Sequence, residues 1–400
     1  MRRAVVVIST LLVAGIAVPA AADHIPVDET PDYNIVDGTP ICGVEGEEYP
    51  PAGDLLGTVP SVGTYNILHS QGENADADVT DRQPQIITAL IEGDVDAWGL
   101  QEVTNDAEHG NQAQELAAAL SDHYGEPWEW CWSMSNPRFP GEPDLLPGGG
   151  GPLSELTAQF SKLPEGDLSG FKEGLAIVTR FHIAHSQFRR LQPRAHEALS
   201  CPIDPDPLAL IDCQFPAVFD SRQVLHAAIV AGGTAFDLFN THIAHSSSSL
   251  THAGPTKKRQ IEKVVATIGD WAASDGFHFL VGDLNSDFER AADRIQPVLD
   301  AGFIDTYGKS GATECRSNDE DPTEGCTTGV EELTPSPSQS PDDVDERIDY
   351  VFARSHRSGC PVLTVTGSRI IGTNAEFIPD LDQWRWPSDH FGVASDTACA

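Results

Sequence analysis

Residues 386–393 have the sequence WPSDHFGV, and the tripeptide Ser388-Asp389-His390 within this stretch decides how the rest of the chain is interpreted. On its own it consists only of three polar residues. Other short polar motifs occur upstream, each at the end of an apolar run of strand-like composition. They are TYN (Asn66), QE (Glu102), NTH (His242), GDLN (Asp283 and Asn285) and RIDY (Asp349). Because each motif ends a predicted strand, we expect these polar side chains to meet at one edge of a β-sheet.

The composition limits the classes of function. The 400 residues suffice for one large core or two smaller ones. The formal net charge of −37 repels polyphosphates and argues against a general basic face for nucleic acid. It does not exclude a nuclease, because a metal ion and a few arginines can reverse the potential inside one cleft. Solubility in a medium whose salt screens the repulsion is the simpler explanation of the charge.

Residues 1–22 have the features of a signal peptide. Arg2 and Arg3 form a positive start, residues 4–18 are apolar, and small residues up to Ala22 offer a cleavage site. The alternative is an uncleaved membrane anchor, although such spans usually need about 20 unbroken apolar residues. We therefore expect a secreted protein, monomeric and without stable membrane insertion.

The cysteines support export. Their number, 8, is even, which in an oxidising compartment predicts disulfides. The pairs Cys201–Cys213 and Cys315–Cys326 would close short loops, but the spacing leaves the connectivity open. The chain has no CxxC motif and no Cys/His spacing typical of structural zinc.

The chain is organised as one domain. Residues 23–56 form an extended lead-in, and residues 57–400 form the domain, with loop insertions near 135–170 and 310–346, the second acidic and rich in Ser and Pro. Apolar periodicity predicts helices at 81–92, 111–120 and 256–273. Strands are expected at 59–68, 96–103, 174–183, 224–230, 236–244, 277–285 and 347–354. Many strands and few helices favour an α/β domain of two packed sheets flanked by helices.

The acids and amides suit a divalent metal ion and a phosphate. Glu102 and Asn66 would supply oxygen ligands for Mg²⁺ or Mn²⁺, with Ca²⁺ as a further candidate, although a lone glutamate after a strand is usually solvated. Asp283 would orient a water molecule, and Asn285 would donate to a phosphoryl oxygen. An Asx turn with a helix cap is the alternative for GDLN.

His242 and His390 are the groups suited to proton transfer at neutral pH. Asp349 would hold His390 in the tautomer that accepts a proton, and Glu173 would do the same for His242. Asp389 would add a metal ligand. A lone histidine in a strand is more often structural, and only the carboxylate partners favour catalysis here.

Three further features are less specific. Arg180 and Arg222 lie beside strands and would neutralise phosphate, with surface ion pairs as the alternative. The motif WEWCW at 128–132 could stack bases, although such clusters more often pack in a core. Ser388 lacks the GxSxG context of a serine hydrolase.

The ordered set TYN, QE, KEG, NTH, GDLN, RIDY and SDH resembles the endonuclease/exonuclease/phosphatase superfamily, which has the DNase I-like fold. The resemblance runs from about residue 58 to about residue 395. It implies a four-layered α/β sandwich of two packed mixed β-sheets flanked by helices, with the active site at one end of the sheets.

The resemblance also implies roles for individual residues. Asn66 and Glu102 correspond to the metal-binding pair, Asp389 to the adjacent acid, and Glu173 to the carboxylate behind His242, the histidine at the scissile phosphate. Asp283 and Asn285 correspond to the pair that orients the nucleophile and binds phosphate, and Asp349 with His390 to the pair that activates water. Arg222 matches a family arginine more loosely.

These correspondences predict a secreted, metal-dependent phosphodiesterase in which water deprotonated by His390 attacks in line, with nucleic acid as the expected substrate. A sphingomyelinase-type phospholipase C and an inositol-phosphate phosphatase are the alternatives. A non-catalytic binding module would usually have lost some of these motifs.

Overall fold

The structure is a computed structural model of the 400-residue chain. It describes residues 37–45, 59–68, 79–106, 110–135, 173–191, 222–232, 234–244, 253–315, 325–328, 346–378 and 383–400. The predicted signal peptide, the insertion at 136–170, and the predicted pair Cys201–Cys213 lie outside these residues. Among the described helices, none has the length and apolarity needed to cross a membrane.

Two mixed β-sheets form the centre of the molecule. Sheet A has the order β1 (Asp37–Gly38), β8 (His182–Arg190), β9 (Gln223–Ala231), β10 (Thr234–His242), β11 (Phe277–Asp283), β13 (Asp349–Ser355) and β12 (Ile304–Asp305). Sheet B has the order β14 (Leu363–Ile371), β17 (Gly392–Cys399), β3 (Val62–Asn66), β4 (Ala97–Asp106), β7 (Glu173–Thr179), β6 (Trp128–Met134) and β2 (Ile41–Glu45), with β5 (Gly110–Asn111) paired to β4. A separate hairpin joins β15 (Glu376–Ile378) to β16 (Gln383–Arg385).

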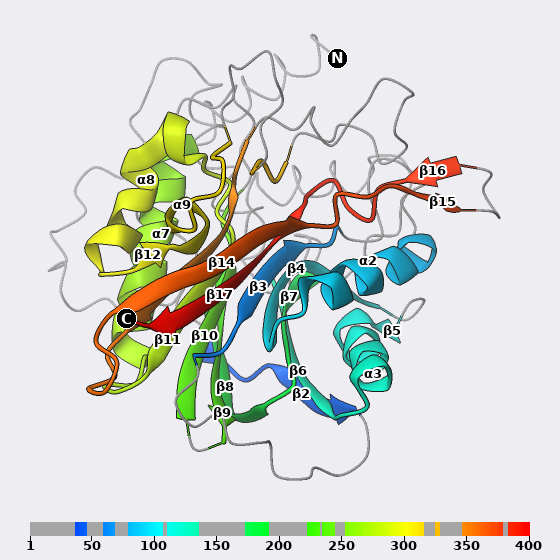
Figure 1. The fold of residues 1–400 in the computed structure, drawn as a ribbon, viewed down its shortest axis with the longest axis horizontal. Helices are drawn as coiled ribbons and strands as arrows, with labels where there is room; N and C mark the ends of the chain where they lie inside the picture. The colour runs from blue at the N-terminus through cyan, green and yellow to red at the C-terminus, as the bar shows by residue number, and fades with distance from the viewer. Residues whose placement is uncertain are drawn as a thin grey trace, which may run out of the picture.

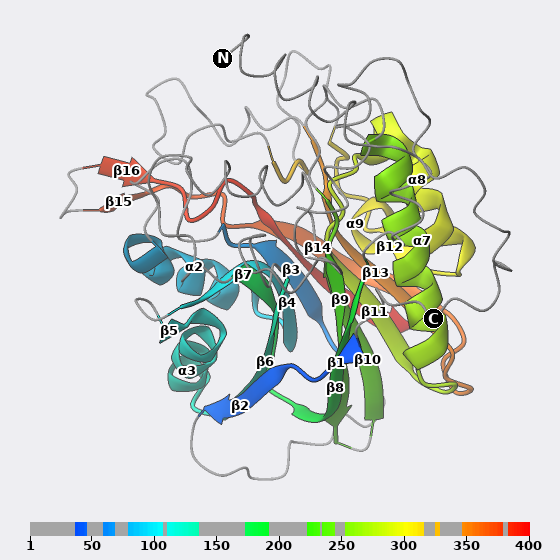
Figure 2. The same ribbon diagram turned by 180° about the vertical axis from the view of Figure 1, so that it is seen from behind.

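Helices cover the outer face of each sheet (Figures 1 and 2). Helices α2 (Val79–Gly93) and α3 (Gln112–Tyr124) pack on sheet B, while α7 (Ala253–Trp271) and α8 (Phe288–Asp300) pack on sheet A. A short helix, α9 (Thr306–Lys309), follows β12. The predicted four-layered sandwich is therefore confirmed. The three predicted helices also form, with ends shifted by a few residues, whereas α8 was not predicted because Pro297 interrupts its pattern.

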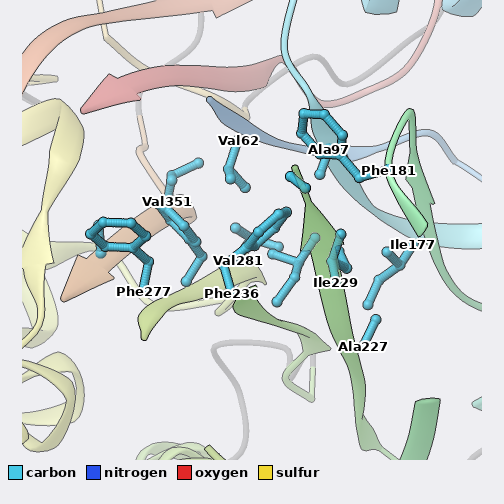
Figure 3. Close-up of a cluster of buried hydrophobic side chains, with 14 of the residues drawn as sticks. Val62, Ala97, Ile177, Phe181, Ala227, Ile229, Phe236, Phe277, Val281 and Val351 are labelled. Carbon is cyan, nitrogen blue, oxygen red and sulfur yellow. The ribbon is translucent and has the colours of Figure 1, made fainter. Parts of the chain in front are cut away.

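The main core lies between the two sheets (Figure 3). Val62 and Ile177 of sheet B pack in one buried cluster with Phe236, Val281 and Val351 of sheet A. Burial of this apolar surface is the principal force that holds the sheets face to face. A two-sheet core of this kind fixes the relative position of the strand ends, on which the site depends.

One buried polar link crosses the same core. Gln101 Nε2 donates to Asn240 Oδ1 at 2.7 Å, and Asn240 Nδ2 donates to the carbonyls of Leu100 and Ala176, both at 2.8 Å. Asn240 belongs to sheet A and its three partners to sheet B. Buried amides are stable only when they are hydrogen-bonded, so this link also sets the register of the sheets.

The strand predicted at 174–183 is wrong in one respect, because the segment forms parts of two strands. β7 ends at Thr179 in sheet B, and β8 begins at His182 in sheet A. Phe181 lies between them and is buried in the inter-sheet core. The chain thus crosses from one sheet to the other without a glycine or proline to mark the turn.

The fold also begins earlier than the sequence indicates. Within the expected lead-in, β1 pairs with β8 and β2 pairs with β6, so this segment adds an edge strand to each large sheet. The disulfide Cys42–Cys131 fastens β2 to β6. In the same β6, the three tryptophans of WEWCW are at most 5% exposed, so packing is their role.

Three buried ionisable side chains of sheet A, those of His226, Asp237 and His278, lie away from the predicted site. His226 Nε2 is 2.7 Å from Asp237 Oδ1, and His278 Nε2 is 3.5 Å from Asp237 Oδ2. Arg354 Nε donates to His278 Nδ1 at 3.1 Å, so neutral His278 carries its hydrogen on Nε2, which faces the carbonyl of Ala273 at 2.8 Å. Burial lowers the pKa of His278 to about 4; Asp237 opposes this shift and Arg354 adds to it.

Candidate active site

Strand register brings three predicted residues to one edge of sheet A. His242 at the end of β10 lies opposite Asp283 at the end of β11, and Asp283 lies opposite Asp349 at the start of β13. In sheet B, Asn66 at the end of β3 lies opposite Gln101 of β4. Asn66 Nδ2 donates to Asp283 Oδ2 at 3.2 Å, so the two strand ends meet across the sandwich.

A β-bulge positions Glu102. The pairing of β4 with β7 shifts between Leu100 and Val103, and Glu102 has a φ of 59°, in the left-handed region. Such a backbone is rare outside glycine and asparagine and re-aims the side chain. Glu102 Oε1 accepts from Asn66 Nδ2 at 3.1 Å. The bulge therefore directs this carboxylate toward the strand end that carries Asn66.

The glycine in GDLN permits a close strand approach. Gly282 has a φ of 142°, and a Cβ on this residue would lie 1.8 Å from the carbonyl oxygen of Thr241 in β10. Any other residue would push β11 away from β10. The next residue, Asp283, would then lose its place opposite His242.

Asp349 and His390 form the predicted pair. His390 Nδ1 lies 2.9 Å from Asp349 Oδ2, and both side chains are buried. In the neutral ring, Nδ1 donates to this carboxylate and Nε2 is the acceptor; Nε2 lies 3.9 Å from Asp283 Oδ2. Ser388 has a structural role, because its hydroxyl donates to the carbonyl of Asn66 at 2.7 Å.

The structure corrects the expected pairing of His242 with Glu173. Arg222 lies between them, with Nη1 3.0 Å from His242 Nδ1 and 3.8 Å from Glu173 Oε1. A guanidinium only donates, so Nδ1 of His242 accepts, and the hydrogen of the neutral ring is on Nε2. Nε2 lies 3.3 Å from Asp283 Oδ2. Arg222 therefore connects Glu173 with His242.

Asn285 supports Asp283 in this structure. Its Nδ2 donates to the carbonyl of Ile243 at 2.9 Å and approaches Asp283 Oδ2 at 3.3 Å, while its backbone N–H donates to Asp283 Oδ1 at 2.7 Å. A φ of 46° at Asn285 makes this turn possible. Both amide hydrogens are directed at protein acceptors, so in this structure Asn285 orients the carboxylate of Asp283, in line with the Asx-turn alternative; its predicted donation to a phosphoryl oxygen stays a prediction.

The charges of this cluster oppose one another. Burial would raise the pKa of Asp283, but His242, His390 and the N–H of Asn285 outweigh it and hold this pKa below its ordinary value. Burial would lower the pKa of His390, but Asp349 in contact with it raises this pKa well above the ordinary value, with Asp389 and Asp283 adding to the rise. The imidazole of His390, with its raised pKa, therefore faces the ionised carboxylate of Asp283.

The oxygen donors fit a divalent cation. Burial raises the pKa of Asp389, His390 opposes this, and the negative charge of Glu102 raises it further. Two carboxylates that repel each other in this way are stabilised by a cation between them. In addition, donor atoms of Asp283, Asp349 and His390 lie within 4.8 Å of one another. Carboxylate oxygens are the ligands that Mg²⁺ and Mn²⁺ prefer.

Arg180 is not brought to this cluster. It follows β7 at the end where Thr179 pairs with Ala97, whereas Glu173 at the other end of β7 pairs near Glu102. Its guanidinium lies 3.5 Å from Asp96 Oδ1. The position of Arg180 therefore agrees with an ion pair, the alternative to a role in neutralising phosphate.

Arg82 is a residue of the site that the sequence reasoning missed. It is fully buried, and its Nη1 donates to the carbonyls of Ile67 at 2.8 Å and Pro387 at 2.7 Å. Its Nη2 donates to the carbonyl of Leu68 at 2.7 Å. The guanidinium thus ties the segment after Asn66 to the residue before Ser388. A signal existed, since Arg82 begins the i, i+4, i+8 series of the buried helix face.

Thr327 is a second such residue. Its Oγ1 accepts from the backbone N–H groups of Ile348 at 3.1 Å and Asp349 at 3.2 Å. Its carbonyl accepts from the N–H of Phe391 at 2.7 Å. The preceding Cys326 is joined to Cys315, as predicted. This part of the expected flexible insertion therefore holds the backbone beside both Asp349 and His390.

Comparisons with known proteins agree with this arrangement. The sequence model of the Endonuclease/Exonuclease/phosphatase family matches residues 63–390. No match was found among curated proteins. A family protein from Leptotrichia buccalis is similar in structure, with 17% identity, a TM-score of 0.52, and coverage of 85% of this chain and 99% of that one.

A mannosyl-6-phosphatase from Bacteroides thetaiotaomicron is also similar, with 17% identity, a TM-score of 0.53 and the same coverage. At this identity the solved structures establish the shared fold only. The family match spans the polar motifs from the strand of Asn66 to His390 itself. The chain therefore belongs to the Endonuclease/Exonuclease/phosphatase family.

Proposed function

We propose that the protein is a divalent-metal-dependent phosphodiesterase acting on nucleic acid. The observation that carries the proposal is the meeting of two histidines, each beside a carboxylate, with Asn66 and Glu102 at the joined ends of the two sheets. Members of the family hydrolyse phosphate esters. Such hydrolysis needs a general base, and His390 with Asp349 supplies one.

The side chains divide the work as follows. His390 Nε2, held by Asp349 on Nδ1, takes the proton of the attacking water, and Asp283 orients that water. His242 presents Nε2–H toward the same region and donates to the leaving oxygen. Glu102 and Asp389, with Asn66 beside them, would hold Mg²⁺ or Mn²⁺, and the ion would stabilise negative charge on the phosphoryl oxygens. Arg222 keeps His242 in the donating tautomer.

We infer further that the protein is exported. Disulfides persist in oxidising compartments, and the described residues contain Cys42–Cys131, Cys315–Cys326 and Cys360–Cys399. The signal peptide predicted at residues 1–22 agrees with this inference. Export favours a nuclease or phospholipase over an inositol phosphatase.

The test is a substrate panel. Purified protein is incubated with Mg²⁺ or Mn²⁺ and plasmid DNA, RNA, sphingomyelin or inositol phosphates, with EDTA as the metal-free arm. We expect metal-dependent cleavage of DNA or RNA, lost in His390→Ala and kept in His185→Ala, which changes an exposed histidine of β8. Cleavage of sphingomyelin or inositol phosphates alone would reassign the substrate. No metal-dependent release from any of the four would leave a binding module.

A further inference from the structure

The hairpin β15–β16 stands beside the candidate site. It pairs with neither large sheet, and it projects past α2 from the body of the sandwich (Figure 1). Its second strand ends three residues before Ser388. Trp386, directly after β16, packs against Phe391 with ring centroids 5.6 Å apart, and Pro387 accepts a hydrogen bond from Arg82. The base of the hairpin is thus fixed to the segment that carries Asp389 and His390.

Arg385, the last residue of β16, has an unusual environment. Its side chain is only 2% exposed, while the neighbouring Trp384 is 55% exposed. Both Nε and Nη1 of Arg385 are buried without a hydrogen-bond partner in the part of the chain that the structure describes. Burial lowers the pKa of Arg82; Asp389, Tyr65 and Glu102 oppose this shift, and the positive charge of Arg385 adds a small lowering, so the two guanidinium groups repel each other.

A buried guanidinium without a partner is costly. Arginine stays protonated in proteins, so it cannot escape the cost by losing its charge. Buried charges are normally paired, as Arg347 is with Asp305 at 2.6 Å and 3.1 Å. Uncompensated groups of this kind concentrate at binding sites, where the ligand supplies the missing charge.

We propose that Arg385 binds a phosphate group of the substrate that neighbours the scissile one. This rests on the proposed function, and it names the substrate class more closely. A nucleic acid strand carries a phosphate on every nucleotide, whereas a sphingomyelin carries one phosphate only. Arginine is a common partner of phosphate, and the Nε–H and Nη1–H groups of Arg385 are both available to donate to phosphate oxygens. The hairpin β15–β16 pairs with neither large sheet, so a ligand that reaches Arg385 need not disturb the pairing of either sheet.

The first experiment does not depend on activity. Thermal unfolding is followed in EDTA with and without inorganic phosphate, for the wild type, Arg385→Met, Arg385→Lys and Arg189→Met. Arg189 of β8 pairs with Asp270 at 2.7 Å and serves as the matched control. We expect saturating phosphate to raise the midpoint by roughly 2–4 °C in the wild type and the control, less in Arg385→Lys, and not in Arg385→Met. An equal rise in Arg385→Met overturns the proposal.

The same data test the cost of the unpaired charge. Without phosphate, Arg385→Met should unfold at a higher temperature than the wild type, whereas Arg347→Met should unfold at a lower one, because it strands the carboxylate of Asp305. If Arg385→Met lowers the midpoint as far as Arg347→Met does, Arg385 is already neutralised within the protein and the proposal fails.

The second experiment measures discrimination. The substrates are a thymidine dinucleotide with its single internal phosphate and the same dinucleotide with an added 5′-phosphate. The wild type should prefer the second by about tenfold or more in kcat/KM, and Arg385→Met should reduce this ratio toward one. An unchanged ratio overturns the proposal. If neither dinucleotide is cleaved by any variant, the nuclease function fails, and the phosphate-dependent unfolding alone decides the role of Arg385.

Discussion

The buried His278 should make the fold sensitive to acid. In the folded protein its pKa is about 4 against the ordinary 6.5. Between these values the unfolded chain binds a proton that the folded chain does not, so stability falls as the pH decreases. The full contribution is present above pH 6.5 and is lost as the pH falls toward 4. At about 1.36 kcal/mol for each pH unit in this interval, the loss is about 3 kcal/mol.

The substitution His278→Gln isolates this contribution. Glutamine does not titrate, and it can still accept from Arg354 and donate toward Ala273. Free energies of unfolding from urea titrations at pH 8, 7, 5.5 and 4 should show the wild type losing about 3 kcal/mol more than the variant from pH 7 to pH 4. Above pH 7 the two curves should run parallel, which is the internal control. Equal losses in both proteins would refute the assignment of a neutral, buried His278.

Three predictions concern the site. His390→Ala should lower kcat by on the order of 10²–10⁴-fold with an unchanged circular dichroism spectrum, and a rate near that of the wild type would remove His390 as the base. Glu102→Gln should raise the Mg²⁺ concentration for half-maximal activity by about tenfold or more, and an unchanged metal titration would place the ion elsewhere. Thr327→Val should lower kcat by on the order of 10–100-fold at constant KM, with recovery in Thr327→Ser; failure of serine to restore kcat would contradict a role through its hydroxyl.

The site was predictable where a motif ends a strand. His242 and Asp283 end neighbouring parallel strands, and Asp349 begins the antiparallel strand beside them, so the three residues lie at the same end of sheet A. The pairing of Asp349 with His390 was instead expected from the family resemblance, because His390 precedes a strand of the other sheet. The layered fold was predictable for a related reason, since apolar periodicity marks which elements need a partner surface.

Contacts between residues that are distant in sequence, and the crossing of the chain between the two sheets, were not predictable. The side chain of Arg222 is long enough for its guanidinium to lie between Glu173 and His242. No local sequence pattern shows which residues on other strands such a side chain reaches. The crossing from sheet B to sheet A near Phe181 carries no turn residue, so it resembles one continuous strand. Arg385 lies between two tryptophans, Trp384 and Trp386, of which only the second is buried, so the local sequence does not indicate that Arg385 is buried.

The place of β17 has a consequence for the timing of activity. This strand lies between β14 and β3 within sheet B, yet it follows every other described strand in sequence. His390 lies two residues before its first residue, Gly392. During synthesis, at about 5–20 residues per second, a chain that has not yet emerged to β17 lacks both the strand that unites β14 with β3 and the proposed base. A chain that ends before residue 390 therefore lacks the proposed base, so the proposed hydrolysis requires a chain that has been synthesised through this region.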